Sequence, residues 1–168
     1  MLEAVILDDE ATARDHLKRL LDNFSQQIRV IGEAETLQQG VDLIAQLKPS
    51  VVFLDVEMPP ALGFDLLRSY PKPDFSIVFT TAHAEYAIQA IRSSAVDYLL
   101  KPIDPAELKT AIERIIEKQN QEETSLFHNL QENLQRDPAE HKIAVSNLDE
   151  WLFIEKAQIM YLVAARRY

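Results

Sequence analysis

The sequence contains no cysteine in its 168 residues, which excludes disulfide bonds and thiolate metal sites. It also lacks any apolar run close to the roughly 18 residues needed to span a bilayer. The first ten residues, MLEAVILDDE, have neither the basic start nor the longer apolar stretch of a signal peptide. We therefore expect a cytoplasmic protein with no membrane segment.

Basic residues are few relative to acidic ones. The formal net charge is −10, from 17 Lys and Arg against 27 Asp and Glu. Residues 1–120 carry −7, residues 121–140 carry −4, and residues 141–168 carry +1. Nucleic-acid binding needs a basic patch, which the last segment approaches only weakly through Arg166 and Arg167. We interpret those two arginines as solvated charges, and the acidic body favours a cation or a basic partner.

Short apolar runs alternate with stretches of helical spacing over the first 118 residues. The runs are rich in Val and Ile, as in buried parallel strands, and lie at Ala4–Leu7, Ile28–Ile31, Val51–Leu54, Ile77–Phe79 and Ala95–Leu100. Apolar residues at helical spacing lie within Ala13–Phe24, Leu37–Leu47, Phe64–Leu67, Tyr86–Ile91 and Leu108–Ile116. Five strand–helix units in this order predict an α/β fold, a five-stranded doubly wound parallel sheet with helices on both faces.

Capping residues mark the start of the predicted fifth helix, and a second group of apolar residues at helical spacing lies beyond its end. Asp104, Pro105 and Glu107 are typical of an N-cap, a first-turn proline and a capping-box acid. Farther on, four apolar residues share one helical face, at Leu126, Phe127, Leu130 and Leu134. They indicate either a continuation of the fifth helix or a separate linker helix, which is either solvated or paired with a second copy.

The end of the chain has strand periodicity. Three short runs after Pro138 predict strands at Lys142–Val145, Glu150–Ile154 and Gln158–Ala164. The predicted organisation is thus one α/β domain over 1–120, a helical linker over 121–140 and a short β segment over 141–168. That last segment is too short to bury a core alone.

Functional residues of doubly wound sheets collect at the carboxyl ends of the strands. Chemically active side chains follow four of the five predicted strands here, and they are Asp8, Asp9, Glu10, Asp55, Thr81 and Lys101. Each has a simpler explanation when taken alone, as a helix-start acid, a turn residue, a helix cap or a surface lysine. Their joint placement predicts one pocket that holds carboxylates, a hydroxyl and an ammonium group.

Such a pocket has a definite chemistry. Clustered carboxylates repel one another and call for a cation, and Mg²⁺ prefers oxygen ligands of this kind. One carboxylate can act as a nucleophile toward phosphorus and form an aspartyl phosphate. Lys101 would neutralise charge on the transferring group, and the Thr81 hydroxyl would hydrogen-bond it afterwards.

The motifs that carry these residues resemble a response-regulator receiver domain. They are VILDDE at 5–10, FLDVEMPP at 53–60, Gly63-Phe64, VFTTAH at 78–83 and VDYLLKPID at 96–104, and together they cover residues 1–118. The resemblance implies a flavodoxin-like receiver fold and a two-component phosphoprotein. It implies a phosphoacceptor with at most self-dephosphorylation activity rather than a turnover enzyme.

The same resemblance assigns roles to individual residues. It implies that Asp55 is the phosphoacceptor and that Lys101 contacts the phosphoryl group. The implied Mg²⁺ site consists of Asp9 as a direct ligand, Asp8 acting through water, Asp55 and the backbone carbonyl of Glu57. Further implied features are switch residues at Thr81 and Tyr98 and a cis peptide bond before Pro102. The side chains of Glu57 and His83 either set the phosphoryl lifetime or are simple exposed loop groups.

One position departs from the family pattern. The family usually has glycine after the Met-Pro of this loop, and here Pro60 takes that place. Proline cannot adopt a positive φ, so we expect a reshaped loop that still permits phosphorylation.

The VDYLLKPID motif and the YAIQAI stretch at 86–91 are most similar to receivers of the LytR/AlgR type. The output of these proteins is a LytTR DNA-binding domain, and residues 142–168 resemble its opening strands. The resemblance implies a transcription regulator of which this chain is a truncated form, so that DNA is bound only through the full-length output domain. A natural short chain, with strands that form an interaction surface, is the alternative.

The implied partner is a sensor histidine kinase. The resemblance also suggests a homodimer, formed through the fourth helix, fifth strand and fifth helix or through the linker helix. Two other functions compete with this one. A pseudo-receiver would bind partners without phosphorylation, although the full set of site residues argues against it. A haloacid-dehalogenase-type phosphatase would need an acid/base Asp where this chain has Glu57, and a substrate-recognition cap for which the sequence shows no insertion.

Overall fold

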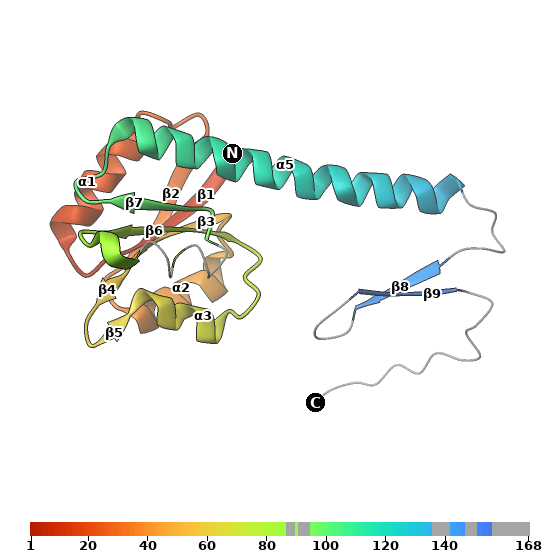
Figure 1. Cartoon of the computed structure of the whole chain (residues 1–168), viewed down its shortest axis with the longest axis horizontal. Coiled ribbons are helices and arrows are strands. Elements are labelled where there is room, and N and C mark those ends of the chain that lie inside the picture. Colours follow the sequence, from red (N-terminus) through yellow and green to blue (C-terminus); the bar gives the residue numbers. More distant parts are fainter. Residues whose placement is uncertain (87–89, 91–94, 136–141, 147–150, 156–168) are drawn as a thin grey trace. The chain divides into compact units, whose positions relative to one another are not determined.

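The computed structural model describes residues 1–86, 90, 95–135, 142–146 and 151–155 (Figure 1). The chain divides into two compact units, Met1–Lys118 and Gln119–Tyr168. The first unit is built on a sheet whose strands pair in parallel in the order β2-β1-β3-β6-β7. These strands are β1 (Leu2–Leu7), β2 (Ile28–Ala34), β3 (Val51–Asp55), β6 (Ser76–Thr81) and β7 (Asp97–Leu100). The predicted five-stranded doubly wound parallel sheet is therefore confirmed.

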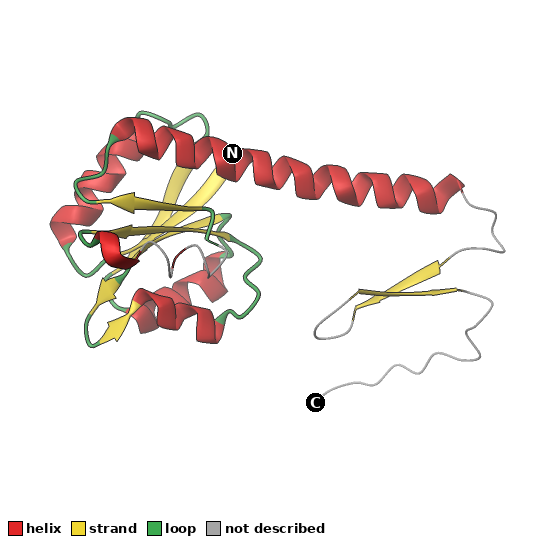
Figure 2. Cartoon of the chain, in the orientation of Figure 1, coloured by secondary structure: helices red, strands yellow, loops and turns green. Residues whose placement is uncertain are grey.

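Helices cover both faces of this sheet (Figure 2). They are α1 (Ala11–Asp22), α2 (Leu37–Leu47), α3 (Leu66–Ser69) and α5 (Pro105–Gln135), with short 3-10 helices η1 (Gly63–Asp65) and η2 (Ala84–Tyr86). Helices α1 and α5 lie on one face, and α2 and α3 lie on the other (Figure 1). The predicted cap is confirmed, because α5 begins at Pro105 and Asp104 Oδ1 accepts a hydrogen bond of 2.7 Å from the Ala106 N–H.

The two-sided burial of β1 shows why its sequence is continuously apolar. Ala4 and Ile6 pack into the core under α1 and α5, while Val5 and Leu7 pack into the core under α2 and α3. All four side chains are 0–1 % exposed. A strand with helices on both faces has no polar side, and this is what a short Val- and Ile-rich run predicts.

Several predicted boundaries need correction. Strand β2 continues to Ala34, because main-chain pairing with β1 extends past the apolar run through Gly32 and Glu33. Strand β7 begins at Asp97 rather than at residue 95. The third helix is a single turn of η1 followed by the four-residue α3. Most of the predicted fourth helix, Tyr86–Ile91, lies outside the described residues, which omit 87–89 and 91–94.

The proline-rich loop after β3 forms a small hairpin. Strands β4 (Glu57–Met58) and β5 (Ala61–Leu62) pair in antiparallel register on either side of Pro59 and Pro60. The Pro59–Pro60 peptide bond is cis. Pro60, where the sequence departs from the family pattern, lies in the turn between these two short strands.

Helix α5 continues to Gln135, so the predicted linker helix is a continuation of the fifth helix. In the second unit, β8 (Lys142–Ser146) and β9 (Trp151–Glu155) form an antiparallel pair. The predicted third strand, at 158–164, lies outside the described residues. No helix in the described part of the chain is long and apolar enough to cross a bilayer.

Candidate functional site

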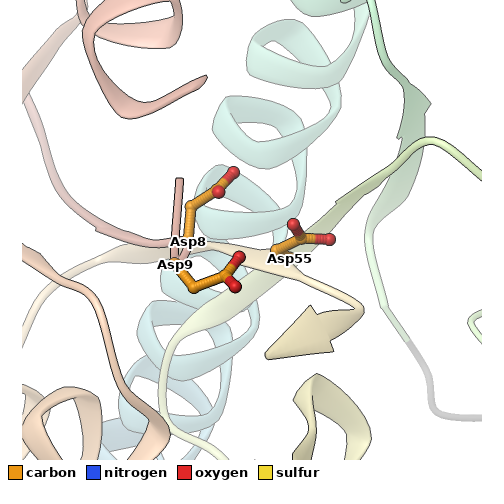
Figure 3. A group of neighbouring side chains, drawn as sticks. All are labelled: Asp8, Asp9 and Asp55. Carbon is orange, nitrogen blue, oxygen red and sulfur yellow. The ribbon is translucent and has the colours of Figure 1, made fainter. Parts of the chain in front are cut away.

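Three carboxylates gather at the carboxyl edge of the sheet (Figure 3). One oxygen each of Asp8, Asp9 and Asp55 lies within 4.8 Å of the others. Asp8 and Asp55 are only 3 % and 5 % exposed, whereas Asp9 is exposed. The predicted metal-binding acids therefore lie together.

Strand order explains this proximity. Strands β1 and β3 are neighbours, with Leu7 paired to Leu54, so the residues that follow them emerge side by side. The main chain of Asp8 is tied to β2 by a 3.1 Å hydrogen bond from its N–H to the carbonyl of Ala34. Two short turns then orient the carboxylates. Asp8 Oδ1 accepts the N–H of Glu10 at 3.0 Å, and Asp55 Oδ1 accepts the N–H of Glu57 at 3.1 Å.

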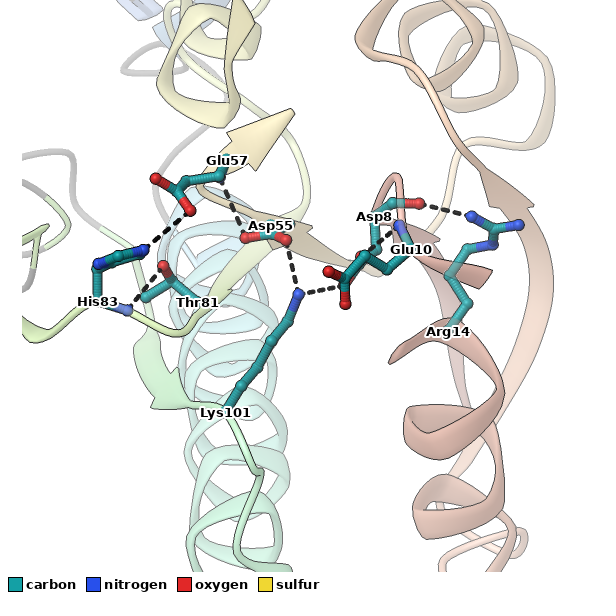
Figure 4. Close-up of polar contacts among 8 residues, drawn as sticks. All are labelled: Asp8, Glu10, Arg14, Asp55, Glu57, Thr81, His83 and Lys101. Atoms are coloured by element: carbon teal, nitrogen blue, oxygen red, sulfur yellow. Dashed lines mark hydrogen bonds and ion pairs between the residues drawn. The ribbon is translucent and has the colours of Figure 1, made fainter. Parts of the chain in front are cut away.

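Lys101 joins the two buried acids (Figure 4). Its Nζ lies 2.7 Å from Asp8 Oδ2 and 2.6 Å from Asp55 Oδ2. Lys101 follows β7 at the far edge of the sheet, and its N–H donates to the Thr81 carbonyl at 2.7 Å. The Lys101–Pro102 peptide bond is cis, as expected. One ammonium is thus shared by two buried carboxylates with a third, Asp9, close by, which leaves the cluster with an excess of negative charge.

The pKa values reflect this crowding. Burial raises the pKa of Asp55 above its usual range, and the proximity of Asp8 adds to the shift. The contacts from Lys101 and from the Glu57 N–H oppose it without cancelling it. Burial alone would lower the pKa of Lys101, but its bonds to Asp55 and Asp8 outweigh burial and raise it. A bound cation would relieve the charge excess that Lys101 leaves.

The donor set suits a hard divalent cation. Three carboxylates from two adjacent strand ends supply oxygen atoms, which Mg²⁺ prefers over nitrogen or sulfur. The exposed position of Asp9 leaves one side open to water, and Mg²⁺ usually keeps several water ligands. The residues present therefore fit an Mg²⁺ ion, with the Glu57 carbonyl as the predicted further ligand.

A second group of contacts surrounds His83 (Figure 4). The buried hydroxyl of Thr81 accepts the His83 N–H at 3.2 Å, and the Tyr98 hydroxyl donates to the His83 carbonyl. His83 Nε2 lies 3.0 Å from Glu57 Oε2. The main chain of His83 thus connects the two predicted switch residues, Thr81 and Tyr98. Its side chain contacts Glu57, which lies two residues after Asp55.

Two residues of this site escaped the sequence analysis in whole or in part. Arg14 donates from Nη1 to the carbonyl of Asp8 at 2.7 Å, and nothing in the local pattern of α1 distinguishes it from a surface arginine. Gly63 was noted only by its place in a motif. A Cβ atom at Gly63 would collide with the carbonyl oxygen of Asp55, so the backbone here requires glycine for close approach.

A cavity of about 390 Å³ opens beside the acidic cluster. Asp8 and Lys101 line its inner side, and Thr12 and His16 of α1 line another. Ile103, which follows Pro102, adds an apolar wall. Of the two buried acids, Asp8 therefore borders a cavity on the side that faces the start of α1.

Residues 4–113 match the family of response regulator receiver domains. The chain is 45% identical over 116 residues to an uncharacterized response regulatory protein of Vibrio parahaemolyticus, covering 68% of this chain and 48% of the relative. It is 37% identical over 135 residues to the transcriptional regulatory protein BtsR of Escherichia coli, covering 80% and 56%. The sensory transduction protein LytT of Bacillus cereus is 35% identical over 133 residues, covering 77% and 53%. The chain spans about half the length of the curated relatives it matches.

Solved structures agree with these relatives. The receiver domain of AraT, a response regulator from Geobacillus stearothermophilus, superposes with a TM-score of 0.65 at 31% identity, covering 73% of this chain and 98% of that one. A response regulator receiver domain from Clostridium thermocellum gives 0.63 at 27% identity, covering 71% and 98%. Family, fold and the acids at the strand ends agree, and the chain belongs to the response regulator receiver family of two-component signalling.

Proposed function

We propose that this chain accepts a phosphoryl group on Asp55 from a sensor histidine kinase. The observation that carries the proposal is the placement of Asp55. Its side chain is buried, is bonded to Lys101 at 2.6 Å and lies beside the acids Asp8 and Asp9. Lys101 and the N–H of Glu57 fix the direction of the Asp55 carboxylate, as Lys101 and the N–H of Glu10 fix that of Asp8. Of the two, Asp55 ends the central strand β3 and carries the FLDVEMPP motif at 53–60, whose resemblance to the receiver family makes it the nucleophile.

The transfer is a displacement at phosphorus. A carboxylate oxygen of Asp55 attacks the phosphorus of the kinase phosphohistidine, and a P–O bond forms as the P–N bond breaks. The electron pair of that bond leaves with the imidazole nitrogen, which takes up a proton. When bound by Asp8, Asp9 and Asp55, Mg²⁺ would supply positive charge to the phosphoryl oxygens.

The chain's own residues handle the remaining charge and geometry. The Lys101 ammonium, paired with Asp55 before transfer, neutralises charge on the transferred group. The Thr81 hydroxyl accepts the His83 N–H and keeps its own proton free to donate to a phosphoryl oxygen. The acyl phosphate is the product, so the chain is a phosphoacceptor, with self-dephosphorylation as its only hydrolytic activity.

Phosphorylation then shifts the population of surface states and controls transcription through a LytTR-type DNA-binding domain. Two observations support this output. Residues 142–168 resemble the first strands of such a domain, and the chain is 37% identical to a transcriptional regulatory protein over 135 residues.

The test is intact mass after incubation with acetyl phosphate and Mg²⁺. We expect a gain of one phosphoryl group, lost in Asp55→Asn and on removal of Mg²⁺ with EDTA. An Asp74→Asn variant, which changes an exposed acid outside the site, is the matched control and should be labelled like the unsubstituted chain. No gain in the unsubstituted chain, under conditions that label another receiver, would leave a pseudo-receiver as the better description.

A further inference from the structure

Arg14 contacts the acidic site from the side opposite Lys101 (Figure 4). It lies near the start of α1, and its Nη1 donates a 2.7 Å hydrogen bond to the main-chain carbonyl of Asp8. The side chain is only 13 % exposed. A charged donor in a bond shielded from water makes one of the stronger protein hydrogen bonds, so this contact restrains the β1–α1 loop effectively.

The oxygen that Arg14 holds belongs to the peptide unit between Asp8 and Asp9. A peptide unit is planar, so fixing its oxygen also fixes the direction in which the Asp9 backbone leaves. On the other side of Asp8, the N–H is held by the Ala34 carbonyl at 3.1 Å. The backbone of Asp8 is thus restrained at its N–H and at its carbonyl, where it joins the exposed Asp9.

Glu33 on β2 forms an ion pair with Arg14, although the buried Arg14 Nε makes no hydrogen bond. Glu33 Oε2 lies 3.6 Å from Arg14 Nε and 2.9 Å from the Nζ of Lys18, which is one helical turn farther along α1. Lys18 also pairs with Asp15 at 2.8 Å. Arg14 and Lys18 are therefore two positive side chains of α1 that both pair with Glu33. They differ in that Arg14 also donates a hydrogen bond to the Asp8 carbonyl.

We propose that Arg14 is a positioning residue of the cation site, which orients the Asp8–Asp9 peptide so that both carboxylates face one ion. The inference rests on the proposed function, because it requires Asp8 and Asp9 to bind Mg²⁺. Arg14 acts through the Asp8 backbone and touches neither the ion nor the phosphoryl group. Removal of an outer partner of a metal ligand typically weakens metal affinity by about 10- to 100-fold.

The experiment compares Arg14→Met with Lys18→Met in the full chain. Mg²⁺ is titrated while the amide resonances of Asp8 and Asp9 are followed by NMR. We expect Arg14→Met to weaken Mg²⁺ binding by about tenfold or more, and to shift the Asp9 amide resonance before any Mg²⁺ is added. Lys18→Met removes the same charge and a Glu33 partner, but leaves the Asp8 contact, and should bind Mg²⁺ like the unsubstituted chain.

Each alternative result has a distinct meaning. Equal weakening by both variants would show a general charge effect and would overturn the role of Arg14, as would unchanged affinity in Arg14→Met. The Arg14→Lys variant keeps one donor for the Asp8 carbonyl and should recover part of the affinity. It also serves as the test if Arg14→Met fails to fold. Absence of Mg²⁺ binding in the unsubstituted chain would instead refute the proposed function itself.

Discussion

At Asp55, burial and charge act in opposite directions. Burial raises its pKa despite the bond to Lys101, so the folded chain holds the Asp55 proton more tightly than the unfolded chain does. A folded-state pKa that is raised contributes stability below the usual Asp range and loses it as the pH rises through the raised value. The ionised Asp55 therefore destabilises the metal-free chain at neutral pH.

This sign predicts the effect of removing the charge. Without Mg²⁺ and at neutral pH, Asp55→Asn should increase the free energy of unfolding, measured by urea denaturation in EDTA. The gain should shrink as the pH falls through the raised pKa of folded Asp55 and be absent below pH about 4, where Asp55 is protonated in folded and unfolded chains alike. Asp74→Asn, at an exposed position, should show no comparable gain. A less stable Asp55→Asn at neutral pH would mean that the Lys101 ion pair outweighs the effect of burial.

The sequence predicted which residues meet at the strand ends, but not the side-chain contacts that join one element to another. The meeting of Asp8, Asp9 and Asp55 follows from strand order alone, because adjacent parallel strands bring their carboxyl ends together. The Arg14 bond to Asp8 depends on how α1 sits against β2, and no spacing rule encodes that arrangement. The Tyr98 bond to the His83 carbonyl likewise joins segments whose approach only the fold determines.

Among the helices and strands, too, some boundaries were predictable from local sequence and others were not. Helix α5 was predictable at its start, where Asp104 and Pro105 supply a cap and a first turn, and the structure confirms both. The end of β2 was not predictable from apolar runs, because main-chain pairing with β1 carries the strand through Glu33. Local chemistry therefore marks a helix start, whereas a ladder can extend a strand beyond its apolar residues.

The Asp104 cap gives a prediction for α5. Asp104→Ala removes the acceptor of the Ala106 N–H, and should lower the free energy of unfolding by about 1 kcal/mol. Asp104→Asn keeps a side-chain oxygen in the same place and should recover most of that loss. Urea denaturation of the full chain, followed by circular dichroism, measures both. An equal loss in the two variants would show that the negative charge, rather than the hydrogen bond, stabilises this end of the helix.

For the molecule as a whole, β7 carries a residue that is bonded to the loop beside the site. Tyr98 on β7 is bonded to His83, and His83 is bonded to Thr81. A phosphoryl group that draws the Thr81 hydroxyl toward Asp55 would therefore move the loop whose carbonyl holds Tyr98. Strand β7 is at the edge of the sheet, and Leu100 near its end is 40 % exposed. A change at Asp55 thus has a short route to an exposed apolar side chain.

This route predicts phosphorylation-dependent self-association through the β7 and α5 surface. Light scattering should give a mass that roughly doubles in the phosphorylated chain, since pairing through this surface would remove the exposed Leu100 side chain from water. Leu100→Ser should abolish the increase without preventing phosphorylation. Leu62→Ser, on β5 and 41 % exposed, matches Leu100 in chemistry and exposure and should leave the increase intact. If phosphorylated Leu100→Ser still doubles in mass, the contact lies elsewhere, and the extension of α5 to Gln135 becomes the surface to substitute next.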